Sequence, residues 1–368
     1  MRIIITGGGT GGHIYPALAI AKGLQNKVPG VDVLYVGTKN GLEADIVPKS
    51  GLFFKTIDVE GLNRPFSHRT LFSLLKAAKG TWEGRKILRS FKPDVVIGTG
   101  GYVCGPLVFS ASTLGISTLI HEQNAFPGLT NRILARFVRH ICVTFEDSLK
   151  YFPCKKNISI TGLPVREEII SRKHLAGLTN LSLSKDKLTV VITGGSRGAR
   201  SLNFAMGSVY QRFWNDKSIQ FYHITGQTGY QESLSFYKEN GLEVLHHDRI
   251  KMVPYLYQME DALAAADIII GRAGASFLSE VMVKGIPSIL VPYPFAAANH
   301  QEHNARAMEK RGAAKVILDH ELEEGKLLSV LETIINDVTL RSRMGVAAKE
   351  MGKANALEDI IKIIVGIS

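Results

Sequence analysis

The sequence has 368 residues, too long for a single hydrophobic core and about right for two domains of ordinary size. Apolar residues make up 45% and charged residues 21%, which is globular usage and excludes disordered, collagen-like and coiled-coil chains. The formal net charge of +11 and the pI near 9.4 favour anionic partners: phosphorylated ligands, an acidic lipid surface or nucleic acid.

The cysteines indicate whether the protein lies in a reducing compartment, and one long uncharged stretch raises the question of a membrane span. Cys104, Cys142 and Cys154 are odd in number and lack metal-ligand spacing, so reduced thiols are expected. Residues 95–120 carry no charge, but glycines and Pro106 interrupt them, so we predict a strand, a turn, a helix and a strand instead of a membrane span.

Short β-branched runs alternate with helical patterns along the whole chain. In the first half, strands are predicted at Ile3–Thr6, Val33–Val36, Val95–Gly98, Ser117–His121, Ile141–Thr144 and Ile158–Thr161, with helices such as Pro16–Lys27 and Asn131–Arg139. After the polar stretch 171–187, strands are predicted at Thr189–Thr193, Gln220–Ile224, Ile268–Ile270, Ser288–Val291 and Lys315–Leu318. This alternation predicts an α/β protein with parallel sheets and right-handed crossovers.

Both halves open with a strand followed by a glycine-rich turn. The turns are residues 6–12 (TGGGTGG) and 193–199 (TGGSRGA). We therefore expect two doubly wound, Rossmann-like domains with a central cleft at the carboxyl ends of both sheets. The predicted boundaries are an N-terminal domain at 1–163, a linker at 164–187, a C-terminal domain at 188–345, and a C-terminal helix in 346–368 that can pack back on the N-terminal domain.

The first turn fits the pattern G-x-G-x-x-G, which suits a phosphate or another anion. The second strand ends in Val36-Gly37-Thr38-Lys39 without an acid for a ribose, which argues against NAD. A purely structural tight turn remains the alternative. His13, at the end of the turn, is a candidate proton acceptor, or else a satisfied structural histidine.

Polar residues also follow later strands of the first half. Residues 99–106 (TGGYVCGP) form another glycine turn, and residues 121–124 (HEQN) come directly after a predicted strand. The amide of Asn124 can bind sugar hydroxyls, or these side chains can bond their own loop.

The second half repeats the theme. The turn around Ser196 and the turn at residues 271–276 offer backbone donors and helix N-termini to a diphosphate. Glu280 lies one helical turn beyond the second turn, where a carboxylate can accept two hydrogen bonds from a ribose. His300 and His303 have no third ligand at metal spacing, and no D-x-D occurs, so no metal site is predicted.

Residues 61–92 carry eight lysines and arginines against one acid, interleaved with apolar and aromatic residues. Such a basic amphipathic segment is typical of a membrane-surface element, and an ordinary solvated helix is the alternative. Its predicted membrane-facing residues are Phe72, Leu75, Lys76, Lys79, Trp82, Arg85 and Lys86. Arg132, Arg136 and Arg139 add a basic stripe at helical spacing. No recognised nucleic-acid module is present, so no nucleic-acid partner is expected.

Together the motifs resemble the MurG family of peptidoglycan glycosyltransferases. The matching stretches are GGGTGGHIYPALA from Gly7, GTKNGLEADIVP from Gly37, GTGGYVCGP from Gly98, HEQNAFPGLTNR from His121, TGLPVR from Thr161, GGSRGA from Gly194, GRAGASFLSE from Gly271 and NHQEHNARA from Asn299. They span nearly the whole chain, in order, and their combination is specific.

The resemblance implies a GT-B fold with UDP-N-acetylglucosamine on the C-terminal domain and a lipid-linked acceptor on the N-terminal domain. It assigns the ribose to Glu280, the uracil to the backbone near Leu256, the diphosphate to Ser196 and Arg166, and the sugar to Asn124, His300 and Gln301. Thr10, Gly11 and Gly12 are also implied in substrate binding, with Gly9, Gly100, Gly101 and Tyr102 in the acceptor and phosphate loops. His13 is the implied base, and no cofactor is expected.

The implied reaction is inverting transfer of N-acetylglucosamine to the C4 hydroxyl of undecaprenyl-diphosphate-linked N-acetylmuramyl pentapeptide, which converts lipid I to lipid II. The enzyme would work as a peripheral protein at the anionic cytoplasmic face of the bacterial cell membrane. Three alternatives stay open: a GT-B glycolipid synthase with a diacylglycerol acceptor, a non-hydrolysing UDP-N-acetylglucosamine epimerase, and a non-enzymatic phosphate- or nucleic-acid-binding protein.

Overall fold

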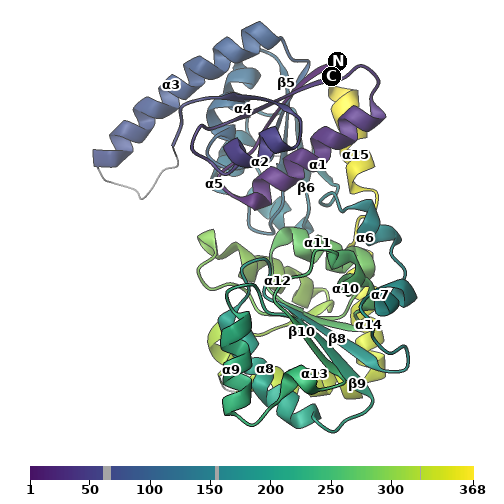
Figure 1. Ribbon diagram of the computed structural model, residues 1–368. Helices are drawn as coiled ribbons and strands as arrows, with labels where there is room; N and C mark the ends of the chain where they lie inside the picture. The colour runs from purple at the N-terminus through teal and green to yellow at the C-terminus, as the bar shows by residue number, and fades with distance from the viewer. Residues whose placement is uncertain (61–67, 154–156, 324) are drawn as a thin grey trace. The chain divides into compact units, whose positions relative to one another are not determined.

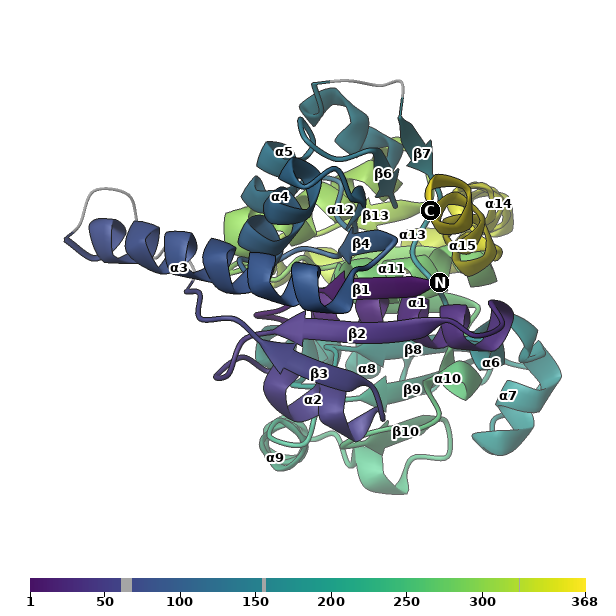
Figure 2. The same cartoon turned by 90° about the horizontal axis from the view of Figure 1, so that it is seen from above.

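The chain folds into two compact units, Met1–Pro164 with Asn355–Ser368, and Val165–Ala354. The computed structural model describes residues 1–60, 68–153, 157–323 and 325–368, with the backbone alone for 68–78. Each unit is a parallel sheet covered by helices on both faces (Figures 1 and 2). The predicted α/β class with two doubly wound sheets is confirmed.

The first sheet has the order β3-β2-β1-β4-β5-β6-β7. Its strands are β1 (Arg2–Thr6), β2 (Asp32–Gly37), β3 (Phe53–Thr56), β4 (Val95–Gly98), β5 (Ser117–Glu122), β6 (His140–Val143) and β7 (Ile158–Ile160). The central strand β1 pairs with β2 on one side and with β4 on the other. The winding direction therefore reverses between β1 and β4.

Helices bury a separate apolar cluster on each face of this sheet. One face is covered by α1 (Gly11–Lys27), α2 (Glu43–Lys49) and α15 (Ala356–Ile367), and the other by α3 (His68–Phe91), α4 (Cys104–Thr113) and α5 (Leu129–Leu134). The C-terminal α15 packs against α1, where the missing side chain of Gly23 leaves room for Leu357. Among the described residues, no helix is long and apolar enough to cross a membrane.

The second sheet has the order β10-β9-β8-β11-β12-β13. Its strands are β8 (Leu188–Thr193), β9 (Ile219–Ile224), β10 (Ile250–Val253), β11 (Ile268–Gly271), β12 (Ser288–Leu290) and β13 (Ala314–Val316). The α-helices that follow β8 in this unit are α8 (Arg200–Phe213), α9 (Tyr230–Glu239), α10 (Met259–Ala265), α11 (Ala275–Lys284), α12 (His300–Lys310), α13 (Lys326–Asn336) and α14 (Val338–Met351). The stretch 164–187, predicted as a linker, holds α6 (Glu167–Ser171) and α7 (His174–Asn180), which both pack against α10.

Several predicted elements differ from the structure. Edge strands β3 (FFKT) and β10 (IKMV) were not predicted, because a lysine interrupts each short run of apolar residues. Helix α1 begins at Gly11 and not at Pro16, since the Thr10 carbonyl already accepts from His13 N and Ile14 N. Helix α5 ends at Leu134 because the chain is extended by Arg139, whose N–H bonds the Thr118 carbonyl of β5.

The early end of α5 also corrects the predicted basic stripe. Of its three arginines only Arg132 lies in the helix, and Arg136 and Arg139 follow it. The guanidinium of Arg132 lies 5.6 Å from the Phe126 ring centroid, and that of Arg139 donates to Ser117. The three side chains therefore do not form one helical face.

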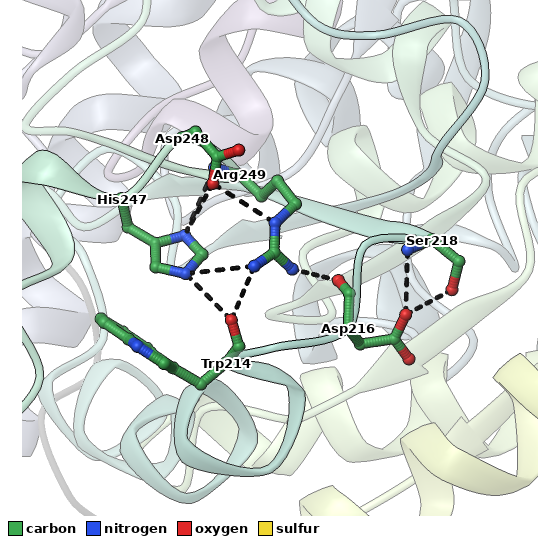
Figure 3. A network of polar contacts seen from close by, with 6 residues as sticks. All are labelled: Trp214, Asp216, Ser218, His247, Asp248 and Arg249. Atoms are coloured by element: carbon green, nitrogen blue, oxygen red, sulfur yellow. Dashed lines mark hydrogen bonds and ion pairs between the residues drawn. The ribbon is translucent and has the colours of Figure 1, made fainter.

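A charged network of the second unit lies where β9 and β10 begin, at the opposite ends of the strands from the glycine turns (Figure 3). The buried guanidinium of Arg249 donates to the carbonyls of Trp214, at 2.7 Å, and Asp216. His247 donates from Nε2 to the same Trp214 carbonyl at 3.0 Å. Because backbone carbonyls take these donors, the network ties the end of α8 to the start of β10 and is structural.

Candidate active site

The glycine turns lie at the reversal point of each sheet. In the first unit they follow β1 and β4, and in the second they follow β8 and β11. Ligands of doubly wound sheets bind at such a reversal, outside the carboxyl ends of the strands. The topology therefore places the predicted turns in pairs.

Hydrogen bonds from three other elements fix the first glycine turn of the N-terminal unit. Tyr35 donates from Oη to the Gly7 carbonyl at 2.7 Å, and Gly8 N donates to the Gly100 carbonyl at 3.3 Å. Gly9 N donates to Glu43 Oε2 at 3.1 Å. Gly9, Thr10, Gly11 and Gly12, all predicted to bind substrate, thus follow a rigid loop into the start of α1.

His13 is half-buried in the first turn of α1. Its Nδ1 lies 2.9 Å from the Gly8 carbonyl and 3.3 Å from Thr10 Oγ1. A carbonyl can only accept, so Nδ1 carries the proton and Nε2 holds the lone pair. This tautomer suits a proton acceptor at Nε2.

The second turn packs directly against the first. Gly100 and Gly101 have φ of 110° and 86°, and a Cβ on Gly101 would overlap the Gly8 carbonyl. Tyr102 lies against Gly9 and lines a cavity of about 490 Å³ with Thr38, Lys39 and other residues that follow β2 and β3. The predicted loop residues of the N-terminal unit are therefore contiguous.

Glu43 is the main feature of this site that sequence analysis missed. Its side chain is fully buried at the start of α2 and accepts from Gly9 N and from both donors of Thr38. The polar loop 38–41 after β2 was the available signal, but it does not reveal the contact across 34 residues to Gly9.

The polar run 121–124 makes hydrogen bonds within the protein, both to its own loop and to loops far along the chain. His121 lies in β5, donates to the Gly162 carbonyl at 2.8 Å, and burial lowers its pKa to about 4. The Glu122 carboxylate accepts from the N–H and side-chain amide of Asn124 and from Gly128 and Asn131. Asn124 itself is half-buried, with its amide turned to Glu122.

In the second unit, the turn after β8 lines a cavity of about 460 Å³. Its lining includes the exposed Ser196, Gly274 at the start of α11, Phe277, Tyr293 and Gln301. Three of the predicted donor-binding features thus border one cavity: the Ser196 turn, the turn after β11, and Gln301.

Gln301 and His300 open α12. The Oε1 atom of Gln301 accepts from Ala273 N at 3.1 Å and Tyr293 N at 3.0 Å, so its amide N–H groups remain as donors for a ligand. His300 donates from Nδ1 to the Ala297 carbonyl at 2.8 Å. Both side chains therefore also fix the loop that precedes α12.

Glu280 lies in α11 beside a group of charges from α6 and α10. Burial raises the pKa of Glu280 to about 7, the Glu260 carboxylate adds to the rise, and Arg166 opposes it. Arg166 precedes α6, with its guanidinium 3.7 Å from Glu260. The structure thus places Arg166 beside this carboxylate group, and its predicted contact with the diphosphate stays a prediction. Among the described residues, Glu280 has no hydrogen-bond partner.

Leu256 lies half-buried in the loop after β10, and its exposed sequence neighbours Tyr255 and Tyr257 contact each other edge-to-face, with ring centroids 4.9 Å apart. Arg272 was not singled out from the sequence, yet it borders the same cavity as Ser196. It is fixed by the Val291 and Pro292 carbonyls and by Asp319. Arg272 therefore ties the turn after β11 to the segment after β12 and to Asp319.

The basic segment is described only in part. The side chains of Phe72, Leu75 and Lys76 lie outside the described residues. Lys79 pairs with Asp58 at 2.6 Å and lies near Glu83, whereas Lys86 lies over the Trp82 ring. Arg85 donates to Thr113 of α4 at 3.3 Å.

The thiols are buried. Cys104 and Cys142 are free cysteines, and burial raises the pKa of each to about 12, which makes them unreactive. Cys154 lies outside the described residues. Within the described part of the chain, no group of three His, Cys, Asp or Glu side chains gathers closely enough to hold a metal ion.

Two tandem doubly wound units, each with paired glycine turns at the reversal of its sheet, define the class: this is a glycosyltransferase of the GT-B type. Residues 3–143 match the glycosyltransferase family 28 N-terminal domain and residues 189–362 its C-terminal domain. The chain belongs to this family, in its MurG branch.

The chain is similar to named relatives and to a solved structure over its full length. The chain is 51% identical to the UDP-N-acetylglucosamine--N-acetylmuramyl-(pentapeptide) pyrophosphoryl-undecaprenol N-acetylglucosamine transferase of Desulforamulus reducens, over 99% of this chain and 98% of the relative. The enzyme of the same name from Moorella thermoacetica is 47% identical over the same shares. The crystal structure of Acinetobacter baumannii MurG matches with a TM-score of 0.81 and 29% identity, over 99% of each chain.

Proposed function

We propose that the chain transfers N-acetylglucosamine from UDP-N-acetylglucosamine to the C4 hydroxyl of N-acetylmuramyl pentapeptide on undecaprenyl diphosphate. The observation that carries the proposal is the identity of about half the residues, end to end, with relatives named for this transfer. Both substrates contain a diphosphate, and each unit offers glycine turns and helix N-termini that suit such an anion.

The donor binds the second unit in this proposal. The turn at Ser196 and the start of α11 hold the diphosphate, and Glu280 accepts from the ribose hydroxyls. The backbone near Leu256 meets the uracil, while His300 and the free amide N–H groups of Gln301 meet the sugar. Two sets of contacts stay predictions: the contact of the diphosphate with Arg166, and the contacts of the donor with four residues of the first unit, Thr10, Gly11, Gly12 and Asn124.

The reaction needs one base and a stabilised leaving group. The C4 oxygen of the acceptor bonds to the anomeric carbon opposite UDP, the bond from that carbon to the diphosphate oxygen breaks, and His13 Nε2 takes the hydroxyl proton. Charge that develops on UDP is stabilised by backbone N–H groups and helix N-termini, where one such donor is typically worth about 10²–10³ in rate.

The acceptor carries a polyprenyl chain, so we further propose peripheral binding at the anionic cytoplasmic face of the cell membrane. Trp82 is 59% exposed, with Lys86 Nζ 4.5 Å from its ring centroid. On the adjacent α4, Phe109 is exposed and contacts Phe137 edge-to-face, with the two ring centroids 5.1 Å apart. Exposed rings among basic side chains suit a lipid headgroup region, where each basic residue contributes about 1 kcal/mol.

Transfer of labelled sugar tests the proposal directly. Purified protein is given labelled UDP-N-acetylglucosamine with a lipid-diphosphate muramyl pentapeptide, or with diacylglycerol, or with no acceptor. We expect label only on the muramyl lipid, undiminished by EDTA. Label on diacylglycerol, or conversion of the donor alone to UDP-N-acetylmannosamine, would favour one of the alternative enzymes.

A further inference from the structure

The peptide group between Gly8 and Gly9 joins two side chains from different elements. Its carbonyl, which belongs to Gly8, accepts from His13 Nδ1 at 2.9 Å. Its N–H, which belongs to Gly9, donates to Glu43 Oε2 at 3.1 Å. The two bonds therefore end at the two poles of one planar, conjugated amide.

The Glu43 carboxylate is built into this position. It is 0% exposed, and its Oε1 accepts from Thr38 N at 3.1 Å and Thr38 Oγ1 at 2.7 Å. A Cβ on Gly8, Gly37 or Gly41 would lie within 2.6 Å of the Glu43 side chain, so the glycines make room for it. Among the described residues no cation pairs with Glu43, and N–H and O–H donors alone offset its charge.

A carboxylate that accepts from a peptide N–H polarises that peptide and makes its carbonyl oxygen a stronger acceptor. Here the carbonyl is the partner of His13 Nδ1–H, so its strengthening favours the Nδ1–H tautomer and the doubly protonated ring. A buried aspartate does the same for the histidine of a serine-protease triad by direct contact. In this protein one amide lies between the carboxylate and the ring.

We infer that Glu43 is a positioning residue for the base: through the Gly8–Gly9 peptide it holds His13 with the proton on Nδ1 and stabilises the imidazolium that forms when Nε2 takes the acceptor proton. The inference rests on the proposed function, in which His13 is that base. Glu43 contacts neither substrate nor the reacting atoms in this role.

Steady-state kinetics of five variants test the coupling. Glu43→Gln removes the charge and turns an amide N–H₂ toward one of the N–H donors, so we expect kcat to fall about tenfold or more, with both KM values within about threefold. Thr38→Val is the matched control, because it removes one hydrogen bond to the same carboxylate and leaves the Gly9 bond; its kcat should stay within about threefold.

The decisive comparison is the same change in a His13→Ala background. If Glu43 acts through His13, Glu43→Gln lowers kcat no further there. An equal loss in both backgrounds overturns the inference, and so does an unchanged kcat for Glu43→Gln alone or for His13→Ala alone. Partial recovery of kcat in Glu43→Asp, which restores the charge, supports it.

A second readout does not need transfer. Two-bond ¹H–¹⁵N spectra of the imidazoles, with His13 assigned from a His13→Gln sample, report the tautomer directly. We expect Nδ1–H in the native protein and in Thr38→Val, and a mixture in Glu43→Gln. Nε2–H in the native protein, or an unchanged tautomer in Glu43→Gln, overturns the inference, even if that variant's transfer cannot be measured. A native protein that shows the Nδ1–H tautomer and transfers no sugar would refute only the proposed function.

Discussion

Glu280 gives the sharpest test of the donor site because its ionisation is coupled to its burial. Burial raises the pKa of this carboxyl to about 7, so both forms are populated near neutral pH. An ionised carboxylate can accept from both hydroxyls of a ribose, whereas the protonated acid loses much of that capacity. We therefore expect donor binding to follow the ionised fraction of Glu280.

The size of the effect follows from one charged hydrogen bond. Such bonds contribute about 1.5–3 kcal/mol, so Glu280→Ala should raise the donor KM about 10- to 150-fold. The ribose is remote from the anomeric carbon, so kcat should stay within about threefold. With a pKa of about 7, the ionised fraction rises from roughly a tenth at pH 6 to nine tenths at pH 8.

The assay is the pH dependence of kcat/KM for UDP-N-acetylglucosamine at saturating acceptor, because this ratio reports groups of the free enzyme. It should rise up to about tenfold between pH 6 and pH 8 in the native protein, beyond whatever rise Glu280→Gln shows. Dividing the native profile by the Glu280→Gln profile removes the contribution of His13 and of other groups. A flat quotient would refute the reasoning.

Three further outcomes are expected. His13→Ala should lower kcat about 10²–10⁴-fold at saturating substrates with little change in either KM, and near-normal turnover would exclude His13 as the base. The double change Arg85→Gln, Lys86→Gln should weaken binding to anionic vesicles about tenfold or more at low salt, whereas the control Lys22→Gln on α1 should bind like the native protein. Equal binding by the native protein, the double variant and the control would contradict the proposed membrane-binding surface. Arg249→Met should lower the free energy of unfolding by about 2–4 kcal/mol in urea, because the Asp216 carbonyl loses its Arg249 donor and the Trp214 carbonyl keeps only His247, and a loss below about 1 kcal/mol would contradict that account.

The parts of the site that sequence analysis predicted are those that depend on local chain geometry. A strand followed by glycines and a helix fixes where backbone N–H groups point, so the turns at Gly9 and Ser196 were found at the right strand ends. The limits of α1 and α5 were harder. They depend on the Thr10 carbonyl and on the pairing of Arg139 with β5, and neither contact has a residue-type signal.

The contacts that sequence analysis missed join residues far apart in the chain. Glu43 reaches Gly9 across 34 residues, and Arg272 reaches Asp319 across 47. In each case a charged side chain follows a strand of the sheet, as expected for a ligand contact, but its partner follows another strand: the adjacent β1 for Glu43, and β13, two strands from β11, for Arg272. Parallel sheets bring such loops together, and only the three-dimensional order of the strands says which ones.

Three carboxylates near the ends of parallel strands show why residue type alone does not assign a role. Glu122 has both oxygens occupied by donors of its own loop, so it shapes that loop. Glu43 also accepts hydrogen bonds at both oxygens, but one donor is the Gly9 N–H, which belongs to the peptide group whose carbonyl accepts from His13. The charge of Glu43 therefore acts on His13 through that peptide group. Glu280 has no such donors among the described residues, and burial raises its pKa to about 7. A carboxylate that the fold desolvates without hydrogen bonds gains most from a ligand that supplies them, so of the three only Glu280 is expected to bind the donor directly.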